Sequence, residues 1–184
     1  GFYQKIKSIL GLSLSLAKVK FKLRNEGSYL GIFWYLLSPL AMFLILLSLR
    51  NFTNKNPIEY YPLYLLLGLI MFNIFRYATS LSANAIKSNA GLIKSLKINF
   101  EPFIISWIIQ TVFSHIFEII IFALFMIYFK VSLLGLLFYP IIFFLLIVFI
   151  TGISFILSVA GTYINDIENV WNIFVNMLWF ATPI

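Results

Sequence analysis

Long runs of apolar residues, separated by short polar segments, dominate the pattern of this chain. The runs cover, to within a few residues, positions 29–49, 61–86, 102–129, 134–160 and 170–184. Each of the first four has about 20 residues or more, and a helix of that length, rising 1.5 Å per residue, crosses the hydrocarbon of a bilayer. The pattern predicts an all-α fold, a polytopic transmembrane helix bundle that forms one domain over residues 1–184.

The fifth run has about 15 residues, fewer than the roughly 20 that a membrane span needs. It reaches the last residue of the sequence, Ile184. We therefore expect the C-terminal part to be incomplete here and the natural protein to continue through a sixth span.

The segment before the first run, residues 1–27, is basic and has an ambiguous period. Polar and apolar residues alternate from Lys18 to Arg24, a pattern that alone is typical of a strand. Apolar residues also recur at helical spacing on one face: Ile9, Leu12, Leu16, Val19 and Leu23. We favour an amphipathic helix lying in the membrane interface, which a turn at Gly27 and Ser28 joins to the first span. Its cationic side chains would extend toward lipid phosphate: Lys18, Lys20, Lys22 and Arg24.

The longest polar interruption, Asn84–Pro102, separates the second and third runs and carries Lys87, Lys94 and Lys97. Two interpretations compete for it. It is either a plain connecting loop whose lysines only set the topology, or a surface on which a cytoplasmic partner acts.

The distribution of cations predicts which side of the membrane each loop occupies. If the N-terminus is cytoplasmic, nine cations lie inside: Lys5, Lys7, Lys18, Lys20, Lys22, Arg24, Lys87, Lys94 and Lys97. Only Arg50, Lys55 and Lys130 then lie outside, and Arg76 lies within a span. Cytoplasmic loops of membrane proteins are enriched in Lys and Arg. The sequence therefore predicts a multi-pass membrane protein with a cytoplasmic N-terminus.

Composition supports the membrane assignment and argues against an enzyme. The chain is 62% hydrophobic and only 10% charged, whereas globular domains are nearer a quarter charged. Its net charge of +7 comes from lysines that flank apolar runs, so we expect a lipid surface and not nucleic acid as the partner. One histidine, no cysteine and no Gly-x-x-x-x-Gly-Lys-Ser/Thr loop give no catalytic, metal or nucleotide site. If nucleotide hydrolysis drives this protein, another chain supplies it.

One polar stripe is predicted inside the membrane, on the third run. Its members recur every four residues, with two adjoining neighbours: Ser106, Gln110, Ser114 and Glu118, adjoined by Thr111 and His115. A carboxylate at the centre of a bilayer is costly, so the stripe must face other helices or water. It serves either as interhelical hydrogen bonding, with Glu118 protonated or paired, or as part of a transport path.

Three segments resemble the membrane subunit of ABC-2 type exporters, specifically the branch that exports O-antigen, capsule or teichoic acid. The first is Lys22–Trp34 with Leu37 and Pro39, which is similar to a basic interfacial helix leading through Ser-x-Leu-Gly-x-x-Trp into the first span. The second is Ser88–Lys94, preceded by Ala83 and Asn84. The third is Tyr163 and Asp166 of the third cytoplasmic loop, followed by Leu178–Ile184.

The resemblance implies a permease of a prokaryotic plasma (inner) membrane that moves polysaccharide or a lipid-linked glycan from the cytoplasmic side. It would work as a homodimer on two ABC ATPase subunits that bind ATP and Mg²⁺. It makes the polar loop the ATPase-coupling loop, with these candidate residues: Asn84, Ser88, Asn89, Ala90, Gly91, Leu92, Ile93, Lys94 and Glu101. The alternatives are an ABC-2 exporter of a small drug or lipid, and a membrane scaffold subunit that transports nothing. ATP-dependent flux would exclude the scaffold.

Overall fold

A computed structural model describes residues 2–26, 31, 33–51 and 59–182. Within these ranges the chain is helical and has no strand, which confirms the all-α prediction. The α-helices are α1 (Phe2–Asn25), α2 (Phe33–Asn51), α3 (Tyr61–Ala83), α4 (Ala85–Ser88), α5 (Ala90–Leu96), α6 (Glu101–Tyr128), α7 (Tyr139–Tyr163) and α8 (Ile167–Ala181), with a 3₁₀ helix η1 at Leu133–Leu137. The predicted turn at Gly27–Ser28, the motif residues Tyr29, Leu30 and Ile32, and Lys55, Pro183 and Ile184 lie outside the described residues.

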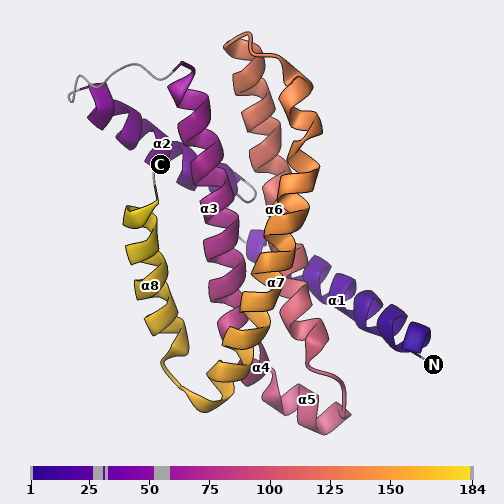
Figure 1. The fold of residues 1–184 in the computed structure, drawn as a ribbon. Helices are drawn as coiled ribbons and strands as arrows, with labels where there is room; N and C mark the ends of the chain where they lie inside the picture. Colours follow the sequence, from indigo (N-terminus) through magenta and orange to yellow (C-terminus); the bar gives the residue numbers. More distant parts are fainter. Residues whose placement is uncertain (1, 27–30, 32, 52–58, 183–184) are drawn as a thin grey trace.

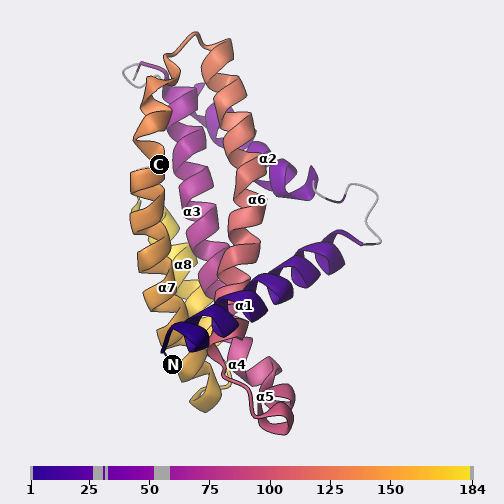
Figure 2. The ribbon, with the colours of Figure 1, turned by 90° about the vertical axis from the view of Figure 1, so that its right-hand side faces the viewer.

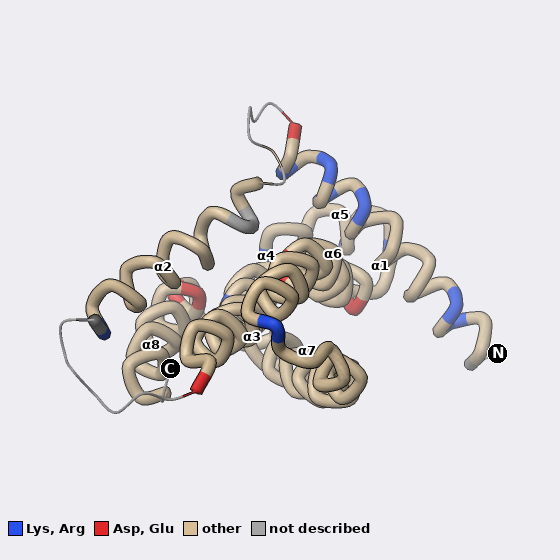
Figure 3. Tube along the Cα trace, turned by 90° about the horizontal axis from the view of Figure 1, so that it is seen from above, with Lys and Arg blue, Asp and Glu red and all other residues tan. Residues whose placement is uncertain are grey.

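Three helices, α3, α6 and α7, are long and apolar enough to cross a membrane. They run side by side through the length of the bundle (Figure 1). The helices α2 and α8 are apolar but shorter, so the first and fifth membrane spans remain predictions. Few charged residues interrupt the three long helices, whereas Lys and Arg recur along α1 (Figure 3). The chain is a multi-pass membrane protein.

The helix α3 is the centre of the bundle, because it packs against α2, α6, α7 and α8. One apolar cluster joins it to α2 and α6 through Phe43, Leu66 and Phe122. A second joins it to α7 and α8 through Ile150 and Val175. The outer face of α7 carries many exposed apolar side chains, as suits contact with lipid.

A glycine sets the close crossing of α3 and α7 at the end that carries α4 and α5. Gly161 of α7 is buried, and a Cβ added there would meet the backbone carbonyl oxygen of Ala83. It would also come within 3.2 Å of Ile167. Any larger residue at this position must therefore push the two helices apart.

The helix α1 packs chiefly against α6 and lies across the bundle, clear of the long axis of α3, α6 and α7 (Figure 2). The helical reading of residues 18–24 is thus confirmed, and the competing strand is wrong, because α1 continues through Arg24. The face of α1 that packs contains Ser13 and Ala17, which are both fully buried. Small residues such as these let the backbones of two helices approach closely. Val19 and Leu23 are exposed instead, on the outer side of α1.

Proline and polar residues fix the helix boundaries more closely than the apolar runs do. The apolar run from residue 134 begins as η1, and α7 starts only at Tyr139, where Pro140 occupies the first turn. The hydroxyl of Ser132 accepts a hydrogen bond from the backbone of Leu134 at 3.3 Å and so caps η1. The run that ends at residue 86 contains a helix break at Asn84, between α3 and α4.

Candidate functional site

The polar loop between α3 and α6 is folded as two short helices. Its first half, α4, packs against α6 and α7 with Ala85 fully buried. The backbone N–H of Ile86 donates to the hydroxyl of Ser158 on α7 at 3.3 Å. Ser88 and Asn89 donate side-chain hydrogen bonds to carbonyls one turn earlier, at 2.7 and 2.8 Å, and so close the break before α5. This half of the loop is therefore held firmly to the bundle.

The second half, α5, has no buried residue and stands away from the long helices (Figures 1 and 2). Leu92 and Leu96 are 52% and 62% exposed, so two leucines about one turn apart present apolar surface on the same helix. A side chain added at Gly91 would meet nothing within 4 Å. Lys94 is exposed and Ala90 and Ile93 are half-buried. The surface formed by Gly91, Leu92 and Leu96 is thus open to contact with another protein.

The third predicted cytoplasmic loop lies next to α4. The Asn84 amide donates a hydrogen bond to the Glu168 carboxylate, and Nζ of Lys87 lies 2.9 Å from Oδ1 of Asn165. Tyr163 and Asp166 are exposed at the same end of the bundle. Glu101 opens α6, where a carboxylate interacts favourably with the helix dipole. The structure therefore brings the second motif together with Tyr163 and Asp166 of the third at one end of the molecule, whereas residues 178–181 lie at the other end of α8.

The cations of α1 do not all point outward, which corrects the expectation for Lys20. Lys18 and Lys22 are exposed, and Lys22 pairs with Glu26 at 3.7 Å. Lys20 instead turns toward α6, because it shares a face with Ala17. Its Nζ donates to Oγ of Ser106 at 2.7 Å and lies 3.8 Å from the centre of the Trp107 ring. Burial in this contact lowers the pKa of Lys20 to about 7.

The polar stripe on α6 is buried between helices along its whole length: Ser106, Gln110, Ser114, His115 and Glu118. It therefore faces protein, as the cost of a carboxylate in lipid requires. Nδ1 of His115 lies 2.9 Å from Oε2 of Glu118, and its other ring nitrogen contacts the Tyr139 hydroxyl of α7. The Tyr139 hydroxyl in turn lies 3.7 Å from Sδ of Met71 on α3. The stripe thus connects the three long helices.

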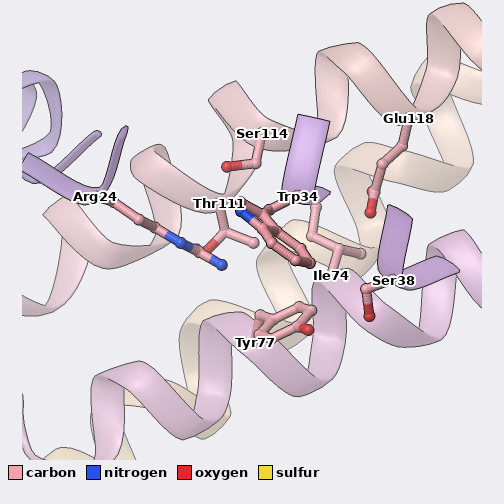
Figure 4. Close-up of a pocket in the computed structure, with 8 residues that line it drawn as sticks. All are labelled: Arg24, Trp34, Ser38, Ile74, Tyr77, Thr111, Ser114 and Glu118. Atoms are coloured by element: carbon pink, nitrogen blue, oxygen red, sulfur yellow. The ribbon is translucent and has the colours of Figure 1, made fainter. Parts of the chain in front are cut away.

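A cavity of about 30 Å³ adjoins this stripe, between α1, α2, α3 and α6. That volume holds about one water molecule. Arg24 approaches it from one side and Glu118 from the other, with the Trp34 ring and Tyr77 between them (Figure 4). The remaining lining residues are Ser38, Ile74, Thr111 and Ser114. The guanidinium of Arg24 also lies 5.8 Å from the Tyr77 ring centre. The basic helix and the intramembrane polar stripe therefore meet at one cavity.

A second polar seam, between α3 and α8, was not foreseen from the sequence. The Ser80 hydroxyl donates to Oδ1 of Asn172 at 2.7 Å, one helical turn from the contact between Asn84 and Glu168. We call this series, with Arg76 opposite Asn176 one turn further along, the α3–α8 ladder. The signal was present as polar residues spaced by four on each segment, but their pairing needs the antiparallel register of the two helices.

Comparisons with known proteins agree with the sequence motifs. No family model matches the chain. It is 21% identical over 175 residues to the O-antigen export system permease protein RfbA of Myxococcus xanthus, covering 95% of this chain and 67% of that protein. It is 26% identical over 186 aligned positions to the protein of the same name from Klebsiella pneumoniae, covering 98% of this chain and 72% of that protein. The resemblance to the ABC-2 permeases of polysaccharide exporters is thereby confirmed, and it extends over nearly the whole of this chain.

Proposed function

We propose that this chain is the membrane-spanning permease subunit of an ATP-driven exporter, which moves polysaccharide or a lipid-linked glycan from the cytoplasmic side across the membrane. Two proteins named as O-antigen export permeases are similar to it over most of its length, which supports this substrate class. The 184 residues hold no phosphate-binding loop, so ATP and Mg²⁺ are assigned to a partner ATPase. A second copy of the chain, a prokaryotic inner membrane and a cytoplasmic N-terminus complete the proposal.

The observation that carries the proposal is the exposed surface of α5. Energy from a separate ATPase must arrive through protein contacts, and Leu92 and Leu96 lie exposed beside the open space at Gly91. The surface of a partner can approach closely at Gly91, and a groove in that surface can receive the Leu92 side chain. Because α4 is held to α6 and α7, a push on α5 reaches the long helices as a rigid-body movement.

The test is the double variant Gly91→Trp with Leu92→Asp in the full-length protein. Neither change meets buried atoms, so we expect normal insertion and normal thermal stability. We expect loss of ATPase binding in co-purification, or retained binding with loss of surface polysaccharide in a staining assay.

A matched control places the same chemistry at the opposite end of the bundle. Gly135 also has nothing within 4 Å of an added Cβ, and its neighbour Leu134 is exposed. Gly135→Trp with Leu134→Asp should leave ATPase binding unchanged. Normal export by the Gly91→Trp, Leu92→Asp variant would return the loop to the role of a plain connector.

A further inference from the structure

A large cavity, open on one side, lies between α2, α3 and α8; Ser38 lines both it and the small cavity beside Glu118. The volume of the large cavity is about 550 Å³. Its polar lining comes from Ser38, Asn73, Arg76 and Asn176, and its apolar lining includes Ile45, Leu69 and Phe180. The cavity therefore has a polar, positively charged part and an apolar part.

Arg76 is a cation inside a helix that is long and apolar enough to cross the membrane. Its guanidinium has two partners on its own helix, Oδ1 of Asn73 at 3.2 Å and the face of Tyr77, 5.2 Å from the ring centre. No carboxylate pairs with it in the part of the chain that the structure describes. A charged side chain at such a position is costly. It generally faces the bundle interior or a water-filled cavity, pairs with another polar group, and marks a path for a substrate or an ion. Arg76 thus has a net charge that its protein neighbours leave unbalanced.

The ladder between α3 and α8 opens at this level. Its first two rungs are closed by direct hydrogen bonds, Asn84 with Glu168 and Ser80 with Asn172. One turn further, Arg76 and Asn176 both line the cavity, but no hydrogen bond joins their side chains, and Asn176 is exposed. A guanidinium offers a planar pair of N–H donors that matches the oxygens of a phosphate, and an amide adds a further donor. The third rung therefore has the chemistry to close on an anion.

The depth of Arg76 favours an anion that is attached to a lipid. Arg76 precedes the end of α3 by seven residues, about 10 Å along the helix axis. On the predicted topology this end is cytoplasmic, so the charge lies within reach of the inner leaflet's headgroups. The apolar lining continues the same space toward the middle of the membrane. A phosphate carried on a hydrocarbon tail fits both parts of the cavity.

We propose that Arg76 and Asn176 bind the phosphate group of the lipid-linked substrate, with its tail against the apolar lining of the cavity. The choice of a substrate lipid rests on the proposed function. The phosphate site itself rests on the unbalanced charge of Arg76, the open rung of the ladder and the two-part cavity. Arg76 would thus hold the phosphate group of the lipid-linked substrate before export.

The test measures ligand binding to the full-length protein in nanodiscs of zwitterionic lipid, by native mass spectrometry. The probes are a short-chain polyprenyl monophosphate, the matching polyprenyl alcohol, phosphatidylglycerol and inorganic phosphate. The variants are Arg76→Gln, Arg76→Lys and Asn176→Asp. The last keeps Arg76 but places a carboxylate opposite it, which should occupy the guanidinium in place of the ligand. Lys130→Gln removes an exposed cation at the far end of α6 and serves as the control.

We expect Arg76→Gln and Asn176→Asp to weaken binding of the polyprenyl phosphate by about tenfold or more, the effect of one charge-assisted hydrogen bond. Arg76→Lys should weaken it less, and binding of the alcohol should not change. Equal affinity for the phosphate and the alcohol, or binding by Asn176→Asp that equals the Lys130→Gln control, would overturn the site. Equal and Arg76-dependent binding of phosphatidylglycerol would overturn the substrate lipid as the occupant, and tight binding of inorganic phosphate would overturn a lipid occupant altogether.

These results are separable from the proposed function. Export is measured in cells as surface polysaccharide, whereas binding is measured on the purified protein. A chain that binds the polyprenyl phosphate through Arg76 but is dispensable for polysaccharide export would refute the exporter and keep the site. If the chain is needed for export but its binding of the polyprenyl phosphate does not depend on Arg76, the exporter function stands and the phosphate site is refuted.

Discussion

Nδ1 of His115 lies 2.9 Å from Oε2 of Glu118, one turn further along α6, and both side chains are buried. The other ring nitrogen of His115 contacts Tyr139 of α7. The carboxyl group of Glu118 thus has a partner on its own helix, and that partner is bound to the next helix. The contact with His115 therefore gives Glu118 a structural role, linking α6 to α7, that needs no bound substrate.

Replacing Glu118 separates the hydrogen bond from the charge. Glu118→Gln keeps an oxygen and an N–H for His115, so we expect thermal stability close to that of the unmodified protein. Glu118→Leu leaves His115 without this partner and should lower the free energy of unfolding by about 1–2 kcal/mol, the scale of a hydrogen bond within a membrane. Thermal unfolding in detergent, followed by size-exclusion chromatography, measures the difference. The control is Ile116→Leu, at an exposed position on the same helix. Equal stability of Glu118→Leu and this control would show that the pair contributes nothing.

Gly161→Ala should disrupt the crossing of α3 and α7. The added methyl group meets the carbonyl of Ala83, which cannot move without displacing the end of α3. Overpacking of this kind costs about 1–3 kcal/mol, and we expect a matching loss of thermal stability. Gly152→Ala on the same helix is the control, since its Cβ would meet nothing within 4 Å. That variant should gain up to about 1 kcal/mol from helix propensity. A Gly161→Ala protein as stable as Gly152→Ala would refute the close crossing.

Packing of α1 against α6 should become stronger as pH rises from about 7 to about 10.5. Burial lowers the pKa of Lys20 from 10.5 to about 7 in the packed state. Between these values the unpacked helix binds a proton that the packed helix does not, so raising the pH favours packing. Below pH 7 both states are protonated and no further change is expected.

The distance distribution between spin labels at Ser15→Cys and Ile120→Cys reports this packing. It should narrow as the pH rises through the window. Lys20→Met should remove the dependence, whereas Lys22→Met, at an exposed position two residues along α1, should retain it. A dependence that survives Lys20→Met would assign it to another group.

Cysteine labelling tests the topology without background, because the chain has no cysteine of its own. Asn89 lies between α4 and α5, and Asn165 between α7 and α8, so both should be labelled from the cytoplasm only. Ser132, exposed between α6 and α7, should be labelled from outside only. Labelling of Asn89 by an impermeant reagent added to whole cells would reverse the topology.

The sequence predicted the helices, the exposed polar loop and the buried stripe well, because each depends on local composition or on a single period. It did not predict which face of α1 packs against the bundle. On the apolar face that helical spacing selects, Val19 and Leu23 are exposed, whereas Ser13 and Ala17, outside that set, are fully buried. At a membrane, apolar side chains suit lipid as well as protein, so hydrophobicity does not identify the face that packs. Small residues identify it better.

The α3–α8 ladder shows a different limit. Ser80 and Asn172 are separated by 92 residues, and neither is unusual within its own helix. The spacing of polar residues by four is visible on each helix alone. Their pairing depends on the antiparallel arrangement and on the axial offset of the two helices, which no local pattern records.

The ladder also has a mechanical consequence. The polar residues of the ladder repeat every four residues on both helices. If α8 slides along α3 by one turn, about 5.4 Å, polar side chains of one helix therefore come opposite new polar side chains of the other. In one direction Glu168 comes opposite Ser80 and Asn172 opposite Arg76. In the other, Asn172 comes opposite Asn84 and Asn176 opposite Ser80. Separation of the helices breaks every rung at once. The contact between α3 and α8 thus resists separation of the two helices but allows more than one axial register between them.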